Sequence, residues 1–148
     1  MTATVVRLTM LFAICILAAS AALADVKPSA RDDGASQRGQ VRVGMASFYG
    51  KGLTGRTTAD GEKFDKNALT AAHPSYPLGT LLMVTNLNNG RAVKVRVNDR
   101  GPVKKHQRKG VIIDLSEGAA RELGFKRDGK TRVKTQVLEL GEGPAKTR

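Results

Sequence analysis

Short runs in which apolar and polar residues alternate constrain the fold of this chain most strongly. A period of two residues places successive side chains on opposite faces of an extended chain, and it predicts half-buried β-strands. The chain is therefore predicted to be mainly β. The alternating positions are Val41, Val43 and Met45; Leu82 and Val84; Val93, Val95 and Val97; and Val133, Thr135 and Val137.

Turn and helix signals separate these runs. Asn88-Asn89-Gly90 contains an Asn-Gly pair, which supplies the positive φ of a tight turn, so residues 81–97 are predicted to form a hairpin. Residues 116–124 begin with an N-capping serine and an early glutamate and end in glycine, which predicts one short helix. A second helical turn is expected over residues 65–71. Short strands with one or two short helices favour a small closed barrel, because closure removes exposed strand edges.

Two aspartates occupy unusual positions in these apolar runs. Asp99 follows the strand pattern that ends at Val97, and Gly101-Pro102 terminates that strand, so Asp99 is expected at a strand end. Asp114 lies inside the run of residues 111–115, which is expected to be a more fully buried strand. A carboxylate in such a strand requires hydrogen-bond partners, a cationic neighbour or a raised pKa. The pair is a candidate acid/base site.

The first 24 residues are typical of a secretory signal peptide. They contain one cation, no acidic residue, an apolar run over residues 8–17, and the sequence Ala22-Leu23-Ala24 before Asp25. The alternative is an uncleaved membrane anchor, for which the run is short. Cys15 lies within this segment, so the mature chain is expected to form no disulfide. Ile14 precedes Cys15 where lipidation signals have a small residue, so we expect an exported, soluble protein without a stable membrane anchor.

The remaining composition describes one small, basic domain. Residues 25–40 are polar and charged and are expected to be a flexible leader, residues 41–140 form the folded block, and residues 141–148 are expected to be a disordered tail. The formal net charge is +12, and it becomes +11 without Arg7 of the signal peptide. Because an exported chain meets little nucleic acid, we expect anionic envelope polymers or lipid headgroups as partners.

Seven motifs, in one order across nearly the whole folded block, resemble the rare lipoprotein A family. They are Gly44-Met45-Ala46-Ser47-Phe48-Tyr49-Gly50, Thr58-Ala59-Asp60-Gly61-Glu62-Lys63-Phe64-Asp65, Thr70-Ala71-Ala72-His73, Leu78-Gly79-Thr80, Val84-Thr85-Asn86-Leu87, Val97-Asn98-Asp99-Arg100-Gly101-Pro102 and Ile113-Asp114-Leu115-Ser116.

The resemblance implies a six-stranded double-psi β-barrel, the fold of expansins, barwin-like proteins and one class of membrane-bound lytic transglycosylases. It also implies a lytic transglycosylase that cleaves the bond between N-acetylmuramic acid and N-acetylglucosamine in peptidoglycan without adding water, and so leaves a 1,6-anhydromuramic end. Many members carry a lipobox cysteine and a C-terminal septal peptidoglycan-binding domain. Neither is apparent in the mature chain, so the resemblance does not imply anchoring or septal targeting here.

The resemblance also assigns candidate catalytic residues. The functional positions of the family fall on Glu62, His73 and Asp99. Asp114 lies where related barrels have a catalytic aspartate, and its apolar strand favours the protonated acid. Arg100 beside Asp99 favours a carboxylate that stabilises developing positive charge. The structural alternatives are an exposed turn glutamate at position 62, a structural histidine at position 73, and strand-end or helix-capping roles for the two aspartates.

Substrate binding is predicted at aromatic and cationic residues. Phe48 or Tyr49 could stack on a sugar ring, but adjacent strand residues face opposite sides, so at most one reaches the cleft and the other belongs to the core. Arg100, Lys104 and Lys105 are the candidate cations, within a rim that continues to Arg108 and Lys109. The alternative for the rim is a solvated loop.

Other chemistries find no support in the sequence. His73 and His106 are the only histidines and lack ligand spacing, so neither metal nor cofactor is expected, and no G-x-S-x-G motif is present. The expected partner is the peptidoglycan glycan strand, bound by a monomer in the periplasm or cell envelope. The alternatives are a non-catalytic, expansin-like wall-binding module and, less favoured, a secreted basic protein acting on host polysaccharide or nucleic acid.

Overall fold

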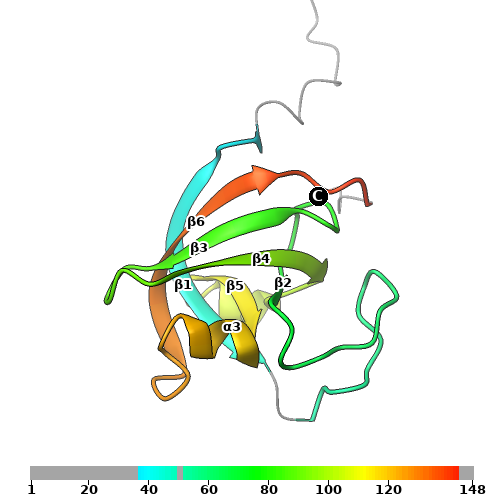
Figure 1. Cartoon of the computed structure of the whole chain (residues 1–148), viewed down its shortest axis with the longest axis horizontal. Helices are drawn as coiled ribbons and strands as arrows, with labels where there is room; N and C mark the ends of the chain where they lie inside the picture. The colour runs from blue at the N-terminus through cyan, green and yellow to red at the C-terminus, as the bar shows by residue number, and fades with distance from the viewer. Residues whose placement is uncertain (1–36, 50–51, 144–148) are drawn as a thin grey trace, which may run out of the picture.

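The computed structural model describes residues 37–49 and 52–143, and six strands in this part form a closed barrel (Figure 1). The predicted signal peptide, most of the predicted leader and most of the predicted tail lie outside the described residues. The order around the barrel is β1-β5-β2-β4-β3-β6. The elements are β1 (Val41–Tyr49), β2 (Thr70–Ala72), β3 (Leu81–Asn86), β4 (Ala92–Asp99), α2 (Lys104–Gln107), β5 (Val111–Ser116), α3 (Glu117–Glu122) and β6 (Lys130–Glu139).

The mainly β prediction and the closed barrel are confirmed. β1 pairs with β5 and β2 pairs with β4 in parallel, while the other neighbouring strands are antiparallel. The interior is filled by apolar side chains, and residues of the described core with no exposed surface include Leu82, Val84, Val97, Ile113 and Leu115. No helix within residues 37–49 and 52–143 is long and apolar enough to cross a membrane.

The hairpin of residues 81–97 is confirmed, since β3 and β4 pair antiparallel up to Thr85 and Ala92. Its connection is longer than a two-residue turn. The Asn86 N–H donates to the Arg91 carbonyl at 2.8 Å, and Gly90 alone takes a positive φ, of 73°. Gly90 therefore supplies the positive φ that the Asn-Gly pair predicts for this turn.

The predicted helix at residues 116–124 is also confirmed, as α3. The Ser116 hydroxyl accepts the Ala119 N–H at 3.2 Å, and Gly124 ends the helix with a φ of 76°. Ala119, Ala120 and the following Leu123 are buried against the barrel core. In Figure 1, α3 lies across the lower end of the barrel.

One expectation for local structure is wrong. Residues 65–71 contain turns and then enter strand β2, because Thr70–Ala72 complete the sheet between β4 and β5. The second short helix is α2 instead. Strand β5 is more fully buried than β4, as expected: Val111, Ile113 and Leu115 are buried in the interior, and Ile112 and Asp114 alternate with them and are half-buried.

A long connection between β1 and β2 borders one end of the barrel (Figure 1). Phe64 anchors this loop, since its side chain is buried and its ring lies 4.9 Å from the Tyr49 ring. The Asp60 N–H donates to the Asn98 carbonyl at 3.2 Å. The loop is thereby held against the end of β4, where Asp99 lies.

Candidate active site

A row of register partners crosses four strands and brings the two predicted aspartates onto one face. Ser47 of β1 pairs with Asp114 of β5, Asp114 pairs with Ala72 of β2, and Ala72 pairs with Asp99 of β4. Register partners on neighbouring strands project to the same side of a sheet. Because neighbouring strands lie about 4.8 Å apart, the two aspartate Cα atoms are separated by about 10 Å.

Asp114 is half-buried within this row. The Ser47 hydroxyl donates to its Oδ1 atom, and a Cβ placed on Gly101 would lie 3.4 Å from its Oδ2 atom. Burial raises the pKa of Asp114 above its ordinary value, although the Ser47 hydrogen bond and the nearby charges of His106 and Lys130 act in the opposite direction. A carboxyl with a raised pKa is suited to hold a proton for transfer.

Asp99 is fixed by backbone groups. Its Oδ1 atom accepts the N–H groups of Ala59 at 3.1 Å and Arg100 at 2.8 Å, and its carbonyl accepts the His73 N–H at 3.1 Å. The bond from Ala59 joins Asp99 to the long loop. Asp99 therefore orders the junction of β4, the loop and the start of the 73–76 turn.

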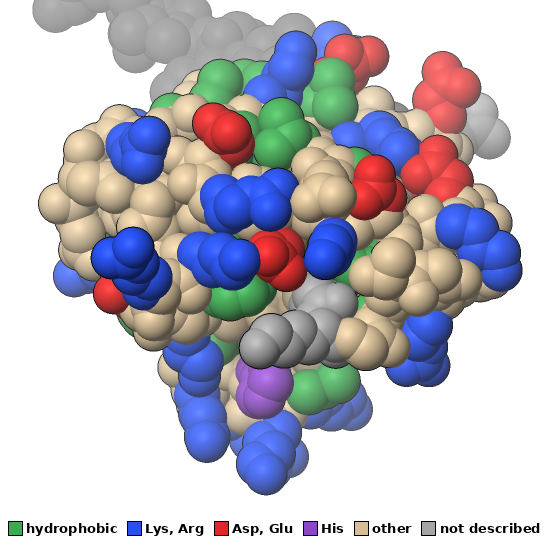
Figure 2. Space-filling model, turned by 60° about the horizontal axis from the view of Figure 1, so that its bottom comes forward, with side chains coloured by type: hydrophobic (Ala, Val, Ile, Leu, Met, Phe, Trp, Pro, Cys, Tyr) green, Lys and Arg blue, Asp and Glu red, His purple; other side chains and the backbone are tan. Residues whose placement is uncertain are grey.

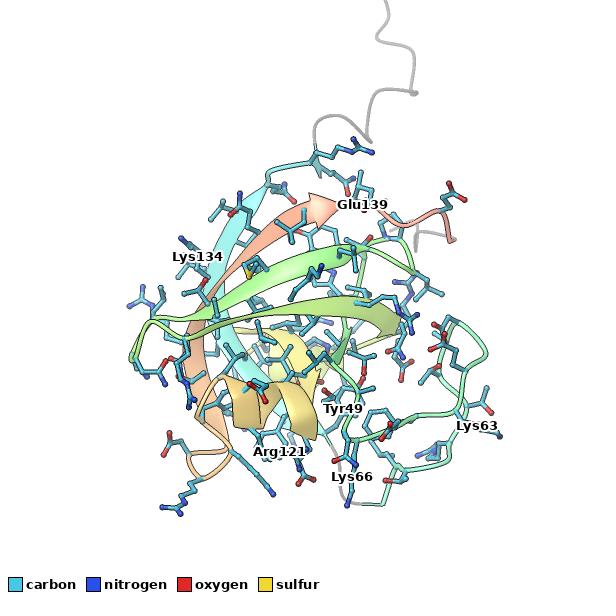
Figure 3. The ribbon with its side chains drawn as sticks, in the orientation of Figure 1. Tyr49, Lys63, Lys66, Arg121, Lys134 and Glu139 are labelled. Atoms are coloured by element: carbon cyan, nitrogen blue, oxygen red, sulfur yellow. The ribbon has the colours of Figure 1, made fainter. Side chains whose placement is uncertain are left out.

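Tyr49 lies beside the carboxylates, at the end of the barrel opposite Glu139 (Figure 3). Its buried hydroxyl has no hydrogen-bond partner among the described residues. Burial raises the pKa of Tyr49, and the charges of Asp99, Asp114 and Asp60 raise it further. The tyrosine is therefore a neutral phenol, and its ring rests on Phe64.

Glu62 reaches the site through the loop and an ion pair. Its carboxylate accepts from Arg96 at 2.6 Å, and the same guanidinium contacts Asp60 at 3.1 Å. The Glu62 N–H donates to Asp60 at 3.1 Å. The Glu62 side chain is 51% exposed, so it faces solvent at the rim rather than the row of aspartates.

His73 is buried and neutral. Its Nδ1 atom accepts the N–H groups of Ser75 at 3.2 Å and Tyr76 at 3.0 Å, and its ring stacks on the Tyr76 ring at 3.9 Å. Burial lowers the pKa of His73 to about 3, and the charges of Arg42 and Arg100 act in the same direction. Because Nδ1 accepts, the neutral ring carries its proton on Nε2.

The predicted substrate-binding residues divide between the site and other regions. Arg100 donates to the carbonyls of Tyr76 at 2.6 Å and His73 at 3.4 Å, and together with Lys104 it lines a groove of about 790 Å³. Lys105 is exposed on α2 and does not line the groove. Phe48 packs against the core, with its ring 6.0 Å from that of Phe125. Phe48 is therefore the core residue of the pair, whereas Tyr49 lies near the carboxylates and does not line the groove.

Sequence reasoning missed Ser47 and Asp60 as parts of the site. Ser47 precedes Tyr49 by two residues, so the period of two in β1 was a signal that both share one face of the strand. For Asp60, the pairing with Arg96 spans 36 positions and has no local signal. Among the described residues, no group of three histidine, cysteine, aspartate or glutamate side chains is placed to hold a metal ion.

Comparison with known proteins decides the family. The family described as "Lytic transglycolase" matches residues 41–135, which include strands β1 to β5 and the first part of β6. The chain belongs to this family.

Similar curated proteins are the probable endolytic peptidoglycan transglycosylase RlpA of Synechocystis sp., 48% identical over 107 residues, and the endolytic peptidoglycan transglycosylase RlpA of Campylobacter jejuni, 48% identical over 103 residues. These matches cover 72% and 70% of this chain but only 32% and 36% of those proteins. The chain thus spans about a third of their length.

Solved structures support the fold of this family member. The Streptomyces papain inhibitor has a TM-score of 0.54 and 22% identity, and the match covers 69% of this chain and 97% of the inhibitor. An expansin of Clavibacter michiganensis in its apo form has a TM-score of 0.53 and 27% identity, and the match covers 71% of this chain and 54% of the expansin. The lytic transglycolase barrel is therefore the six-stranded double-psi β-barrel that the sequence motifs implied.

Proposed function

We propose that this protein is an exported peptidoglycan lytic transglycosylase that acts in the periplasm or cell envelope as a monomer, after cleavage between Ala24 and Asp25. The names of the similar RlpA proteins support this activity. The observation that carries the proposal is the row on the outer barrel face, in which half-buried Asp114, with its raised pKa, shares a face with Asp99.

Asp114 is the general acid and base in this proposal. Its carboxyl proton passes to the glycosidic oxygen of the leaving N-acetylglucosamine, while the bond from that oxygen to C1 of N-acetylmuramic acid breaks. The resulting carboxylate then takes the proton of the C6 hydroxyl as that oxygen bonds to C1, which closes the 1,6-anhydro ring. Asp114 returns to its protonated form, and no water is consumed.

The neighbouring groups support this chemistry. The Asp99 carboxylate lies on the same face and stabilises the positive charge that develops at C1. The Ser47 hydroxyl orients Asp114. His73, being neutral, serves as a positioning residue that fixes the 73–76 turn. Glu62, on the long loop, forms an ion pair with Arg96 of β4.

The test uses residues 25–148 and soluble or sacculus peptidoglycan, with products read by mass spectrometry. We expect anhydromuramic ends from the native protein, and losses of about 10²- to 10⁴-fold for Asp114→Asn and about 10²- to 10³-fold for Asp99→Asn. Asp128→Asn makes the same chemical change at an exposed position after α3 and should keep full activity. Activity should fall as pH rises through the raised pKa of Asp114, because the proton is then lost.

Other products would redirect the assignment. Reducing ends would indicate a hydrolase, which normally uses two carboxyl groups and a water molecule. A fully active Asp114→Asn protein would remove Asp114 as the acid.

The second candidate function is a non-catalytic, expansin-like wall-binding module. The likeness to a Clavibacter michiganensis expansin favours it, because a barrel of this shape occurs in a protein named an expansin. Binding to sacculi without any product would support this function over the lyase.

A further inference from the structure

A groove of about 790 Å³ lies beside the row of aspartates but does not include their side chains. Its walls come from the 73–75 turn, from residues 100–104 and from residues 111–112 of β5. Arg42 of β1 and Gln107 of α2 complete the lining. The groove and the row meet at Gly101, which lines the groove and lies against the Asp114 carboxylate. A molecule that occupies the groove is therefore next to the candidate acid.

The charged side chains among the described lining residues of the groove are cations. Among the described residues that line it are the three cations Arg42, Arg100 and Lys104, and no carboxylate. Neither Arg42 nor Lys104 makes an ion pair within residues 37–49 and 52–143. Cations that line one concave surface concentrate the field there and attract an anion.

Two of these cations are held in place before any ligand binds. The Arg42 guanidinium lies 5.5 Å from the centre of the Tyr76 ring, and the Tyr76 hydroxyl donates to Gln40 at 3.0 Å. Arg100 is fixed by its bonds to the Tyr76 and His73 carbonyls. A site whose donors are already ordered loses less conformational entropy on binding.

We propose that this groove binds a carboxylate carried by the glycan strand and so positions the adjacent glycosidic bond at Asp114. The inference rests on the proposed function, because it takes the glycan strand as the ligand. Arginine and lysine both form charge-assisted hydrogen bonds with carboxylates, and arginine can do so in a bidentate manner. Peptidoglycan offers two sources: the lactyl carboxylate of a muramic acid without a stem peptide, and the carboxylates of the stem peptide itself.

Binding is measured in the Asp114→Asn background, so that cleavage does not consume the ligand. The ligands are three soluble glycan preparations: peptide-free chains, the same chains with carboxyl groups reduced to alcohols, and chains that keep their stem peptides. We expect the reduced chains to bind about tenfold more weakly than the peptide-free chains, since charge-assisted bonds are lost. Adding Arg42→Gln and Lys104→Gln should abolish this difference.

A matched control is Lys94→Gln, which removes one positive charge from the outer face of β4, away from the groove. It should keep the preference for peptide-free over reduced chains. Since Arg42→Gln could weaken the contact with Tyr76, thermal unfolding is compared for every variant. Lys104 is exposed on α2, and Lys104→Gln alone should already reduce the preference for peptide-free chains.

The outcomes separate the two carboxylate sources. Peptide-free chains that bind more tightly than both the reduced and the peptide-bearing chains, through the groove cations, assign the lactyl carboxylate. The reason is that the bond to the stem peptide removes the charge of that carboxylate. Peptide-bearing chains that bind more tightly than both other preparations, through the groove cations, assign the stem peptide. Equal binding of all three preparations by the Asp114→Asn protein, or an undiminished preference in the folded double variant, would overturn the inference.

The same measurements distinguish this inference from the proposed activity. Carboxylate-dependent binding by a native protein that releases no anhydromuramic product would support the groove and refute the lyase. Product formation with no carboxylate dependence would do the opposite.

Discussion

His73 makes stability depend on pH. Its folded pKa of about 3 lies below the ordinary value of 6.5, because burial disfavours the imidazolium. Between these values the unfolded chain binds a proton that the folded chain does not, so the free energy of unfolding falls as pH drops from 6.5 toward 3. The loss attributable to His73 is about 2 kcal/mol at pH 5 relative to pH 7.

Urea unfolding at pH 7, 6 and 5 tests this expectation against His73→Asn. The asparagine oxygen can accept the Ser75 and Tyr76 N–H groups in place of Nδ1 but does not titrate in this range. The variant should therefore lose less stability than the native protein on acidification. Parallel curves for the two proteins would show that His73 is not the group responsible.

Single residues were predicted well where their chemistry conflicted with their local pattern. A carboxylate among valines and isoleucines is noticed in the sequence, and the structure brings Asp99 and Asp114 to one face. The direction of the Arg100 side chain was not predictable from its place beside Asp99. Its guanidinium bonds to the carbonyls of Tyr76 and His73, which only the folded turn supplies.

At the scale of elements, α3 depends on a close approach at Gly118. The Gly118 N–H donates to the Lys66 carbonyl at 2.8 Å, and a Cβ at this position would lie 2.8 Å from the Asn67 carbonyl carbon. Gly118→Ala should lower the free energy of unfolding by about 1–3 kcal/mol, because overpacking against backbone outweighs the better helix propensity of alanine. Urea unfolding measures the change.

Glu122→Ala is the control for this prediction. Glu122 is exposed in the same helix, and its substitution should change stability by no more than about 0.5 kcal/mol. If Gly118→Ala were as stable as the native protein, the turn before β2 would not limit the position of α3.

Elements with local signals were predicted, and elements made by distant pairing were not. The Asn-Gly turn specifies the β3–β4 hairpin, and the Ser116 cap and Gly124 specify α3. Strand β2 has only three residues and exists because β4 and β5 flank it. Its small residues carry no strand signal of their own, so the segment before it was mistaken for a helical turn.

At the scale of the whole molecule, closure of the barrel creates the site. Ser47 and Asp114 are 67 positions apart, and the parallel pairing of β1 with β5 brings them into contact. Motif resemblance implied the barrel, but register, burial and the position of the groove follow only from the packed strands. This is why the sequence indicated the catalytic candidates more completely than the residues around them.

The net charge of the molecule should also control how it meets its substrate. The formal charge is +12, and lysine and arginine side chains are spread over the face shown in Figure 2, with fewer acidic side chains among them. Such a field steers an anionic polymer toward the protein, and salt screens it, with a Debye length that falls from about 10 Å at 0.1 M to about 3 Å at 1 M. For peptide-free glycan chains, kcat/KM should therefore fall at least about fivefold between about 50 and 500 mM NaCl, while kcat changes little.

Carboxyl-reduced chains should show almost no salt dependence. The variant with Arg42→Gln and Lys104→Gln should keep most of the salt dependence, because the remaining cations still provide the long-range field. Equal salt dependence for charged and uncharged chains would mean that salt acts on the protein itself rather than on its encounter with the strand.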